Sequence, residues 1–244
     1  MNKKIGILDS GIGGTTVLNE IIKLLPKEDY VYYADSKNNP YGEKSPEEIY
    51  KIVENIVEFL LKEKDCKMIV IACNTATTRC MKKLKEKYKD IPFVGTVPAI
   101  KVACDNNYKH TLVLATPSTI DSERTKELIE ENRKENQKII LISCDGLANA
   151  IETKNKEKIN DILENVKETT KNTPIDSIVL GCTHYPLIKD EIHKFFKDVP
   201  LLDGSIGVAK EVKRQLENHN LLNTKGTGTV SYTHLRAHET LSDL

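Results

Sequence analysis

Short β-branched runs alternate along the chain with longer stretches in which apolar residues recur at helical spacing. The clearest helix begins after Ser45, with Pro46 at the first helical position and Glu48 completing a capping box. A second helical pattern covers residues 155–171. Alternating strands and helices predict an α/β fold, with mostly parallel sheets flanked by helices. The eight runs that predict buried strands are Ile5–Leu8, Val31–Ala34, Met68–Ala72, Phe93–Gly95, Leu112–Ala115, Ile139–Ser143, Ser177–Gly181 and Leu201–Leu202.

Polar residues directly follow several of these strands. Because ligands of parallel α/β folds bind at the carboxyl ends of the strands, we expect these residues to gather at one edge of the sheets. They are Asp9-Ser10-Gly11, Asp35 with the loop Asn39-Pro40-Tyr41-Gly42, Cys73-Asn74-Thr75, Thr116-Pro117-Ser118-Thr119 and Cys182-Thr183-His184.

Two of the strand ends have similar sequences. Residues 68–75 and 177–184 each consist of an apolar strand, one small residue, a cysteine and two polar residues. The likeness indicates two related halves, each with one cysteine at a strand end. If the halves face each other across a pseudo-two-fold axis, Cys73 and Cys182 lie on opposite sides of a cleft.

Two thiols that flank a small substrate suit a 1,1-proton transfer at a stereocentre, which needs a base on one face and an acid on the other. A free cysteine has a pKa of about 8.5, which a helix N-terminus lowers, and both Cys73 and Cys182 come where a strand gives way to a helix. Each is equally compatible with a buried core cysteine. The spacing alone leaves both interpretations open.

The residues beside the cysteines offer polar groups to a ligand. Asn74, Thr75 and Thr183 are candidates to bind an α-carboxylate at helix starts, and they are also compatible with simple N-caps. His184 is a candidate to adjust Cys182 or to assist the proton transfer, and the alternative is a structural histidine.

The segment after the first strand supports two interpretations. Asp9 and Ser10 are candidates to hold a substrate ammonium and a carboxylate, or they form a turn before a helix. The glycine-rich residues 11–14, together with Asp35, also resemble a dinucleotide-binding fingerprint. Thr16 at the third glycine position argues against a nicotinamide enzyme, as does the Asp9 carboxylate close to the expected pyrophosphate.

The cysteine spacing raises the question of zinc. Cys66, Cys73 and Cys80 recur every seven residues, and His184 and His193 are available. The sequence has no Cys-x-x-Cys pair, which argues against a structural zinc site. A purely binding module is a further alternative, which would need the polar strand ends but not both thiols.

Charge and length narrow the class of protein. The 244 residues include 36 basic and 36 acidic side chains, and this zero net charge gives no electrostatic case for nucleic acid or an anionic membrane as a partner. No apolar run reaches membrane-spanning length, and Ile5–Leu8 is too short for a signal peptide. We therefore expect a cytoplasmic protein whose six cysteines are free thiols.

Six motifs, in order and at matching spacing over roughly residues 4–218, resemble the glutamate racemases of the aspartate/glutamate racemase superfamily. The motifs are Gly6-Ile-Leu-Asp9-Ser10-Gly-Ile-Gly-Gly14, Pro40-Tyr41-Gly42, Ala72-Cys73-Asn74-Thr75-Ala76, Gly95-Thr-Val-Pro98-Ala99, Ala115-Thr-Pro-Ser-Thr119 and Gly181-Cys182-Thr183-His184-Tyr185-Pro186.

The resemblance implies an enzyme that interconverts L- and D-glutamate without pyridoxal phosphate or metal and supplies D-glutamate for peptidoglycan. Cys73 and Cys182 are then the two acid/base residues, one for each face of the substrate, with Asp9 and His184 assisting them. The Pro-Tyr-Gly loop would meet the side-chain carboxylate of glutamate. The substrate-binding residues expected from the resemblance are Asp9, Ser10, Tyr41, Gly42, Asn74, Thr75, Thr119, Thr183 and His184.

The resemblance also implies two pseudo-symmetric α/β lobes, with the active site in the cleft between them, and a homodimer. Residues 1–95 and 208–244 would form the first lobe, and residues 96–207 the second. Aspartate racemase is the nearest rival in the superfamily, and Tyr41-Gly42 with the Cys-Thr-His triplet favours glutamate. Arylmalonate decarboxylase relies on one such thiol, so the presence of both cysteines argues against it.

Three segments depart from the family pattern. Residues 143–149 lack the expected proline-containing pattern, and Thr125 stands where the family usually has a tyrosine. Residues 224–244 show no apolar periodicity, so we expect them to be poorly ordered or loosely docked. From about Gly228 the chain resembles translated adapter sequence rather than the last helix of the family.

Overall fold

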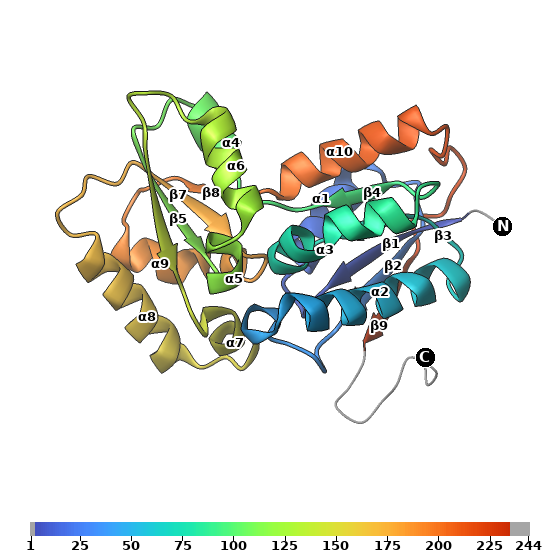
Figure 1. Cartoon of the computed structure of the whole chain (residues 1–244), viewed down its shortest axis with the longest axis horizontal. Helices are drawn as coiled ribbons and strands as arrows, with labels where there is room; N and C mark the ends of the chain where they lie inside the picture. Colours follow the sequence, from blue (N-terminus) through green and yellow to red (C-terminus); the bar gives the residue numbers. More distant parts are fainter. Residues whose placement is uncertain (1–2, 235–244) are drawn as a thin grey trace. The chain divides into compact units, whose positions relative to one another are not determined.

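The computed structural model describes residues 3–234, which fall into two compact α/β units. The first unit contains the residues up to Thr96 together with those from Ser205 onward, and the second contains Val97–Gly204. Each unit has its own parallel sheet and its own helices (Figure 1). The expected α/β class with two parallel sheets is therefore confirmed.

The sheet of the first unit has the strand order β4-β3-β1-β2-β9, and all of its pairings are parallel. Its strands are β1 (Lys4–Asp9), β2 (Tyr30–Ala34), β3 (Cys66–Ile71), β4 (Phe93–Gly95) and β9 (Val230–His234). Its helices are α1 (Thr15–Leu24), α2 (Pro46–Lys62), α3 (Asn74–Lys87) and α10 (Ser205–Asn218), with the short 3-10 helix η1 (Tyr41–Glu43).

Alternation along each strand builds two apolar layers in this unit, because successive side chains of a strand point to opposite faces. In β1, Leu8 packs in the layer formed with α2 and α3, whereas Ile5 and Ile7 pack in the layer formed with α1 and α10. All three side chains are completely buried. Helices therefore cover both faces of the sheet, as the continuous apolar strands predict.

The predicted start of α2 is confirmed in its capping geometry. Pro46 is the first helical residue, and the Ser45 hydroxyl accepts a hydrogen bond from the Glu48 backbone N–H at 3.2 Å. The Glu48 carboxylate pairs with Lys44 at 3.0 Å instead of returning to the Ser45 backbone, so only half of the capping box is present.

The sheet of the second unit has the strand order β6-β5-β7-β8 and is also parallel throughout. One face packs against α7, α8, α9 and η2, and the other packs against α4 and α6. Its strands are β5 (His110–Ala115), β6 (Lys138–Ser143), β7 (Ser177–Gly181) and β8 (Leu201–Leu202). Its helices are α4 (Ile100–Asp105), α5 (Pro117–Ile120), α6 (Glu123–Asn132), α7 (Leu147–Glu152), α8 (Lys156–Thr169) and α9 (Lys189–Phe195), with the 3-10 helix η2 (Tyr185–Ile188).

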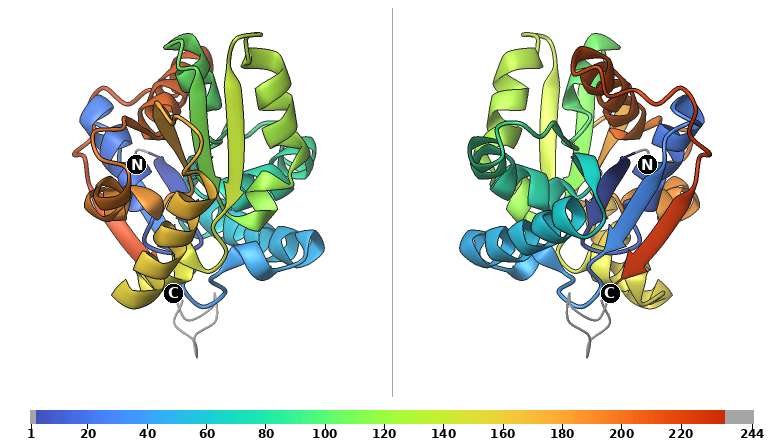
Figure 2. Two further views of the ribbon diagram at one scale, coloured as in Figure 1. Left: turned by 90° about the vertical axis from the view of Figure 1, so that its left-hand side faces the viewer. Right: turned by 90° about the vertical axis from the view of Figure 1, so that its right-hand side faces the viewer.

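All eight predicted strands are present, but β9 was not expected. Val230–His234 pairs in parallel with β2, so the expectation of a loosely docked tail is wrong for these residues (Figure 2). Asp29 fixes the approach to β9, because its Oδ1 accepts from the Thr229 backbone N–H at 2.9 Å and from the Thr227 hydroxyl at 3.0 Å. Residues 235–244 of the expected tail lie outside the described part of the chain.

Across residues 3–234, no helix combines the length and the apolar character that crossing a membrane requires.

Candidate active site

The Asp9 carboxylate organises the loop after β1. Its Oδ2 accepts hydrogen bonds from the backbone N–H groups of Gly11 at 3.1 Å and Gly14 at 3.0 Å, and the residue is completely buried. A Cβ on Gly14 would lie 2.6 Å from Asp9 Cβ and 2.8 Å from the Tyr32 hydroxyl, so only glycine permits this close approach. An internal carboxylate thus occupies the N–H groups that a dinucleotide pyrophosphate would need, which argues against the dinucleotide alternative.

Asp35, the other element of the dinucleotide alternative, is also engaged within the protein. The Tyr41 hydroxyl donates to Asp35 Oδ2 at 2.5 Å, and Asn38 Nδ2 lies 2.9 and 3.1 Å from the two oxygens. Burial raises the pKa of Asp35, against the opposing effect of these hydrogen bonds. Burial, followed by the charges of Asp35, Cys73 and Asp9, holds the pKa of Tyr41 well above its usual value. The structure thus brings three predicted site residues, Asp9, Tyr41 and Cys73, into one region of the first unit.

Cys73 lies at the expected passage from strand to helix and is the N-cap of α3, whereas Asn74 and Thr75, the residues considered as N-caps, are its first two helical residues. It is 5% exposed, and its Sγ accepts a hydrogen bond from the Ala76 backbone N–H at 3.4 Å. Partial positive charge collects on the N–H groups at the start of a helix, so this position stabilises a thiolate relative to a thiol. Cys73 is therefore suited to accept a proton as a base.

Two polar side chains beside these residues are available to a ligand. Ser10 and Asn74 are buried, and neither side chain hydrogen-bonds to any residue in the described range 3–234. Their polar groups are therefore available to hydrogen-bond a polar ligand. Thr75, the next residue of α3, is also buried, and Gly42 follows Tyr41 in η1 and is half-buried.

In the second unit, the side chains of Cys182, His184 and Glu152 are linked in series by hydrogen bonds. Its Sγ lies 3.7 Å from His184 Nδ1, and His184 Nε2 lies 2.7 Å from Glu152 Oε1. Because a carboxylate only accepts hydrogen bonds, Nε2 carries the ring proton and Nδ1 faces the thiol as an acceptor. Cys182 is 8% exposed and His184 is 2% exposed, so water is largely excluded from the contact between the thiol and the imidazole.

The environment of Cys182 differs from the prediction in one respect. The short 3-10 helix after β7 begins at Tyr185, so Cys182 is not the cap of an α-helix. The buried Thr183 lies between the thiol and the helix rather than at a helix start. The imidazole of His184 therefore takes the place of the helix N-terminus that polarises Cys73.

Glu152 is the site residue that the sequence did not reveal. It precedes His184 by 32 residues and is the last residue of α7. The segment 143–149, which departs from the family pattern, leads into this helix, and Gly146 caps it with a φ of +71°. No sequence signal pointed to Glu152, because β5 separates β6 from β7 in the sheet and this strand order cannot be read from the sequence.

Hydroxyl groups fix Thr119 in α5, the short helix that follows β5. The Thr116 hydroxyl donates to Thr119 Oγ1 at 3.0 Å, and the Thr125 hydroxyl donates to the Thr119 carbonyl at 2.7 Å. Thr119 and Thr125 are both completely buried. Thr125, where the family usually has a tyrosine, thus anchors this segment, and a contact of Thr119 with substrate stays a prediction.

The other four cysteines behave as core residues. Burial raises the pKa of Cys66, Cys80 and Cys144 to about 12 and also raises that of Cys104. Over residues 3–234, no three His, Cys, Asp or Glu side chains group closely enough to hold a metal ion. Cys66, Cys73 and Cys80 all pack in the same apolar layer of the first unit.

Comparison with known proteins places these features in a family context. The Asp/Glu/Hydantoin racemase family matches residues 5–211. A glutamate racemase of Clostridium botulinum is 43% identical, over 94% of this chain and 91% of its own length. The crystal structure of glutamate racemase from Francisella tularensis in complex with D-glutamate has a TM-score of 0.83 and 31% identity, covering 96% of this chain and 89% of that one. A glutamate racemase isoform of Bacillus anthracis has a TM-score of 0.80 and 31% identity, covering 95% and 86%.

Proposed function

The chain belongs to the Asp/Glu/hydantoin racemase family and is an amino-acid racemase, and from this premise we propose that it racemises glutamate by a proton transfer between Cys73 and Cys182. The observation that carries the proposal is that each of two equivalent strand ends presents a cysteine with its own polarising partner. That partner is the N–H of Ala76 for Cys73 and the imidazole of His184 for Cys182.

The proposed reaction is a balanced exchange of one proton. One cysteine, as the thiolate, takes the α-proton of glutamate and becomes a thiol. The other cysteine, as a thiol, delivers its proton to the opposite face of the resulting carbanion and becomes a thiolate. The mechanism requires Cys73 and Cys182 to reach opposite faces of the α-carbon, and the reverse reaction uses the same two groups in exchanged roles.

The polar residues at the strand ends stabilise the charge that develops at the α-carbon. Ser10 and Asn74 offer unpaired donors, which we assign to the substrate carboxylates together with Thr75 and Thr183. In the direction in which Cys182 is the base, His184 first takes the thiol proton, the resulting thiolate accepts the α-proton, and Glu152 stabilises the imidazolium until the reverse reaction returns its proton. These groups supply charge stabilisation without an electron-withdrawing cofactor.

We assign the substrate as glutamate because the relatives that match nearly the whole chain are glutamate racemases, one of them in complex with D-glutamate. Tyr41 and Gly42 are the residues proposed to meet the side-chain carboxylate. The product would serve peptidoglycan synthesis, and the enzyme would act as a homodimer in the cytoplasm, as its resemblance to the family implies.

Proton NMR in deuterated buffer tests the proposal directly. Purified enzyme is added separately to L-glutamate, D-glutamate and L-aspartate without pyridoxal phosphate, and the α-proton signal and the optical rotation are followed. Loss of the glutamate α-proton together with decay of rotation is the expected result. Exchange with aspartate alone would overturn the substrate assignment, and no exchange with any of the three would overturn the activity.

A further inference from the structure

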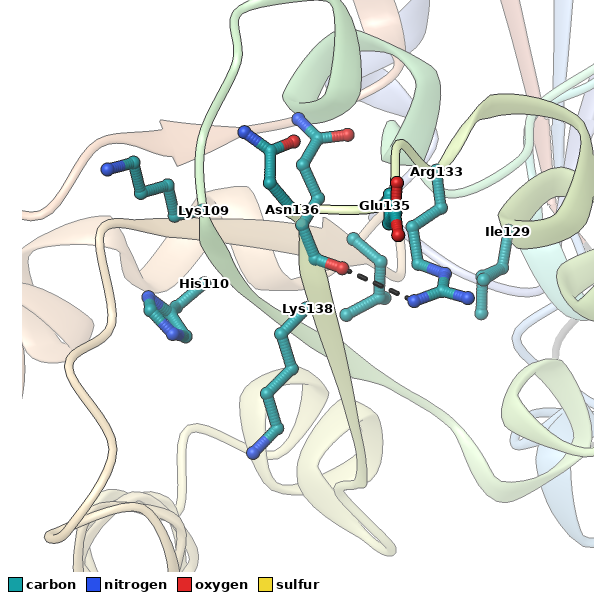
Figure 3. Close-up of a pocket in the computed structure, with 9 residues that line it drawn as sticks. Lys109, His110, Ile129, Arg133, Glu135, Asn136 and Lys138 are labelled. Carbon is teal, nitrogen blue, oxygen red and sulfur yellow. Dashed lines mark hydrogen bonds between the residues drawn. The ribbon is translucent and has the colours of Figure 1, made fainter.

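A cavity lies at the end of the second unit's sheet where β5 and β6 begin, away from Cys182. It has a volume of about 550 Å³ and opens where β5 and β6 begin (Figure 3). Cys182 follows the carboxyl end of β7, whereas the cavity lies where β5 begins. Because β5 and β7 run parallel, the thiol and the cavity are at opposite ends of the sheet. The volume falls within the range of small-molecule sites.

The charge of the cavity is its main chemical feature. Lys109, Arg133 and Lys138 line it, and none of the three forms an ion pair with a residue in the described range 3–234. Its lining includes one carboxylate, Glu135, so three cations and one anion give a net charge of +2 while His110 is neutral. The cavity is therefore electrostatically suited to a dianion.

Buried hydrogen bonds of Gln137 hold the loop between α6 and β6, which Arg133 and Lys138 flank. Gln137 is 3% exposed, and its side-chain Nε2 donates to the carbonyls of Cys104 and Tyr108, each at 3.0 Å. A loop fixed in this way loses little conformational entropy when a ligand binds.

The strand ends that form the other side of the cavity are equally fixed. The Asp176 carboxylate accepts from the backbone N–H groups of Lys109 at 2.7 Å and His110 at 3.0 Å. His110 and Lys138 are partners in the register of β5 and β6, so their side chains leave the same face of the sheet.

Arg133 is positioned to donate into the cavity. Its Nη1 donates to the Gln137 carbonyl at 3.4 Å, which leaves the other guanidinium N–H groups available. Figure 3 shows its side chain beside Ile129, and Ile139 also lines the cavity. The guanidinium of Arg133 thus lies in a cavity that two partly buried apolar side chains, Ile129 and Ile139, also line.

We propose that this cavity binds the phosphate group of a small phosphate monoester. A phosphate monoester carries nearly two negative charges at neutral pH, which matches the net charge of the cavity. Arg133 would hold two phosphate oxygens as a fork, and Lys109 and Lys138 would act as point charges. Ile129 and Ile139 would contact an apolar substituent on the ester.

Titration of the isotopically labelled full chain with inorganic phosphate and with phenyl phosphate tests this site. Ionic strength is held constant, because salt screens exposed charges. The backbone amide signals of Lys109, His110 and Lys138 should shift with both ligands and saturate at lower concentration with phenyl phosphate. The absence of a saturable shift at these residues would overturn the proposal, as would shifts confined to Ser10 and Asn74.

Two double variants separate a specific site from general attraction. Arg133→Gln combined with Lys138→Gln should weaken phenyl phosphate binding by about tenfold or more. Lys156→Gln combined with Lys197→Gln removes the same charge from exposed positions of the same unit and should change binding by less than about twofold. Both double variants should retain racemase activity, which shows that they fold. Equal weakening in the two would refute a specific site.

Discussion

His184 donates its Nε2 hydrogen to Glu152 across 2.7 Å and presents Nδ1 to the Cys182 thiol at 3.7 Å. The carboxylate fixes the orientation and the tautomer of the ring, and it stabilises the imidazolium that forms when His184 takes the thiol proton and leaves Cys182 as the thiolate base. Glu152 is therefore a positioning residue for Cys182, and it acts through the imidazole.

Replacing Glu152 with glutamine should lower kcat/KM for L-glutamate by about a hundredfold, because the amide keeps the shape but loses the charge that stabilises the imidazolium. The pH dependence of kcat/KM should also shift, while the free energy of unfolding should change little. Glu157→Gln, an exposed substitution in α8, is the control and should leave both properties unchanged. A wild-type pH profile in Glu152→Gln would contradict the assigned role.

Removing either proposed catalytic thiol should nearly abolish racemisation. Cys73→Ala and Cys182→Ala should each lower kcat/KM by about a thousandfold or more, because no other group takes over the proton on that face. Cys80→Ala, at a completely buried thiol in α3 whose pKa is raised to about 12, should retain activity and lose about 1 kcal/mol of stability. Steady-state polarimetry measures the turnover of all three variants, and urea unfolding measures the stability of Cys80→Ala. Substantial turnover in Cys73→Ala or Cys182→Ala would rule out the two-thiol exchange.

Because the pKa of Asp35 is raised, the difference in stability between the wild type and Asp35→Asn should depend on pH. Between the ordinary value of 3.8 and the raised value in the folded state, the folded protein holds more protons than the unfolded chain at this group. The contribution of Asp35 to stability therefore falls as the pH rises through this window. The stability of Asp35→Asn relative to the wild type should increase as the pH rises above about 4 and then level off.

Urea unfolding of both proteins from pH 3 to pH 8 measures this difference. The two proteins should differ least at the acidic end, where Asp35 is protonated in the folded and unfolded states alike. A difference that stays constant over the whole pH range would show that the carboxyl is not perturbed.

Two glycine substitutions should have opposite effects on the free energy of unfolding. Gly14→Ala forces a methyl group against Asp9 and the Tyr32 hydroxyl, so it should cost about 1–3 kcal/mol and impair activity by displacing the Asp9 loop. Gly207→Ala adds a methyl group in α10 with nothing within 4 Å, so it should stabilise the protein by up to about 1 kcal/mol. Chemical denaturation with activity measurements compares them, and equal effects would contradict the packing around Gly14.

The parts of the fold that could be predicted from sequence are those encoded locally. Buried strands such as Ile5–Leu8 and Ser177–Gly181 are continuous apolar runs, and α2 carries its own cap at Ser45. The strand β9 was missed although Val230, Tyr232 and Thr233 favour β structure, because an edge strand with an exposed side shows no long apolar run.

The candidate site was predictable where function depends on residues next to a strand end. Cys73 and Cys182 stand out because each comes after an apolar strand and one small residue and is followed by two polar residues. Glu152 was not predictable, because its role depends on the packing of α7 near the end of β7, which no local pattern encodes. The environment of Cys182 was misjudged for a related reason, since sequence spacing does not distinguish an α-helix from the four-residue 3-10 helix that begins at Tyr185.

The two thiols differ in their partners, with a backbone N–H beside Cys73 and an imidazole beside Cys182. The two enantiomers of glutamate nonetheless have the same free energy in water, so the equilibrium constant of the reaction is one. The ratio kcat/KM must then be equal in the two directions at every pH, however unlike the two groups are. The asymmetry can appear only in the separate values of kcat and KM for the two directions, and in unequal deuterium isotope effects for the L and D substrates.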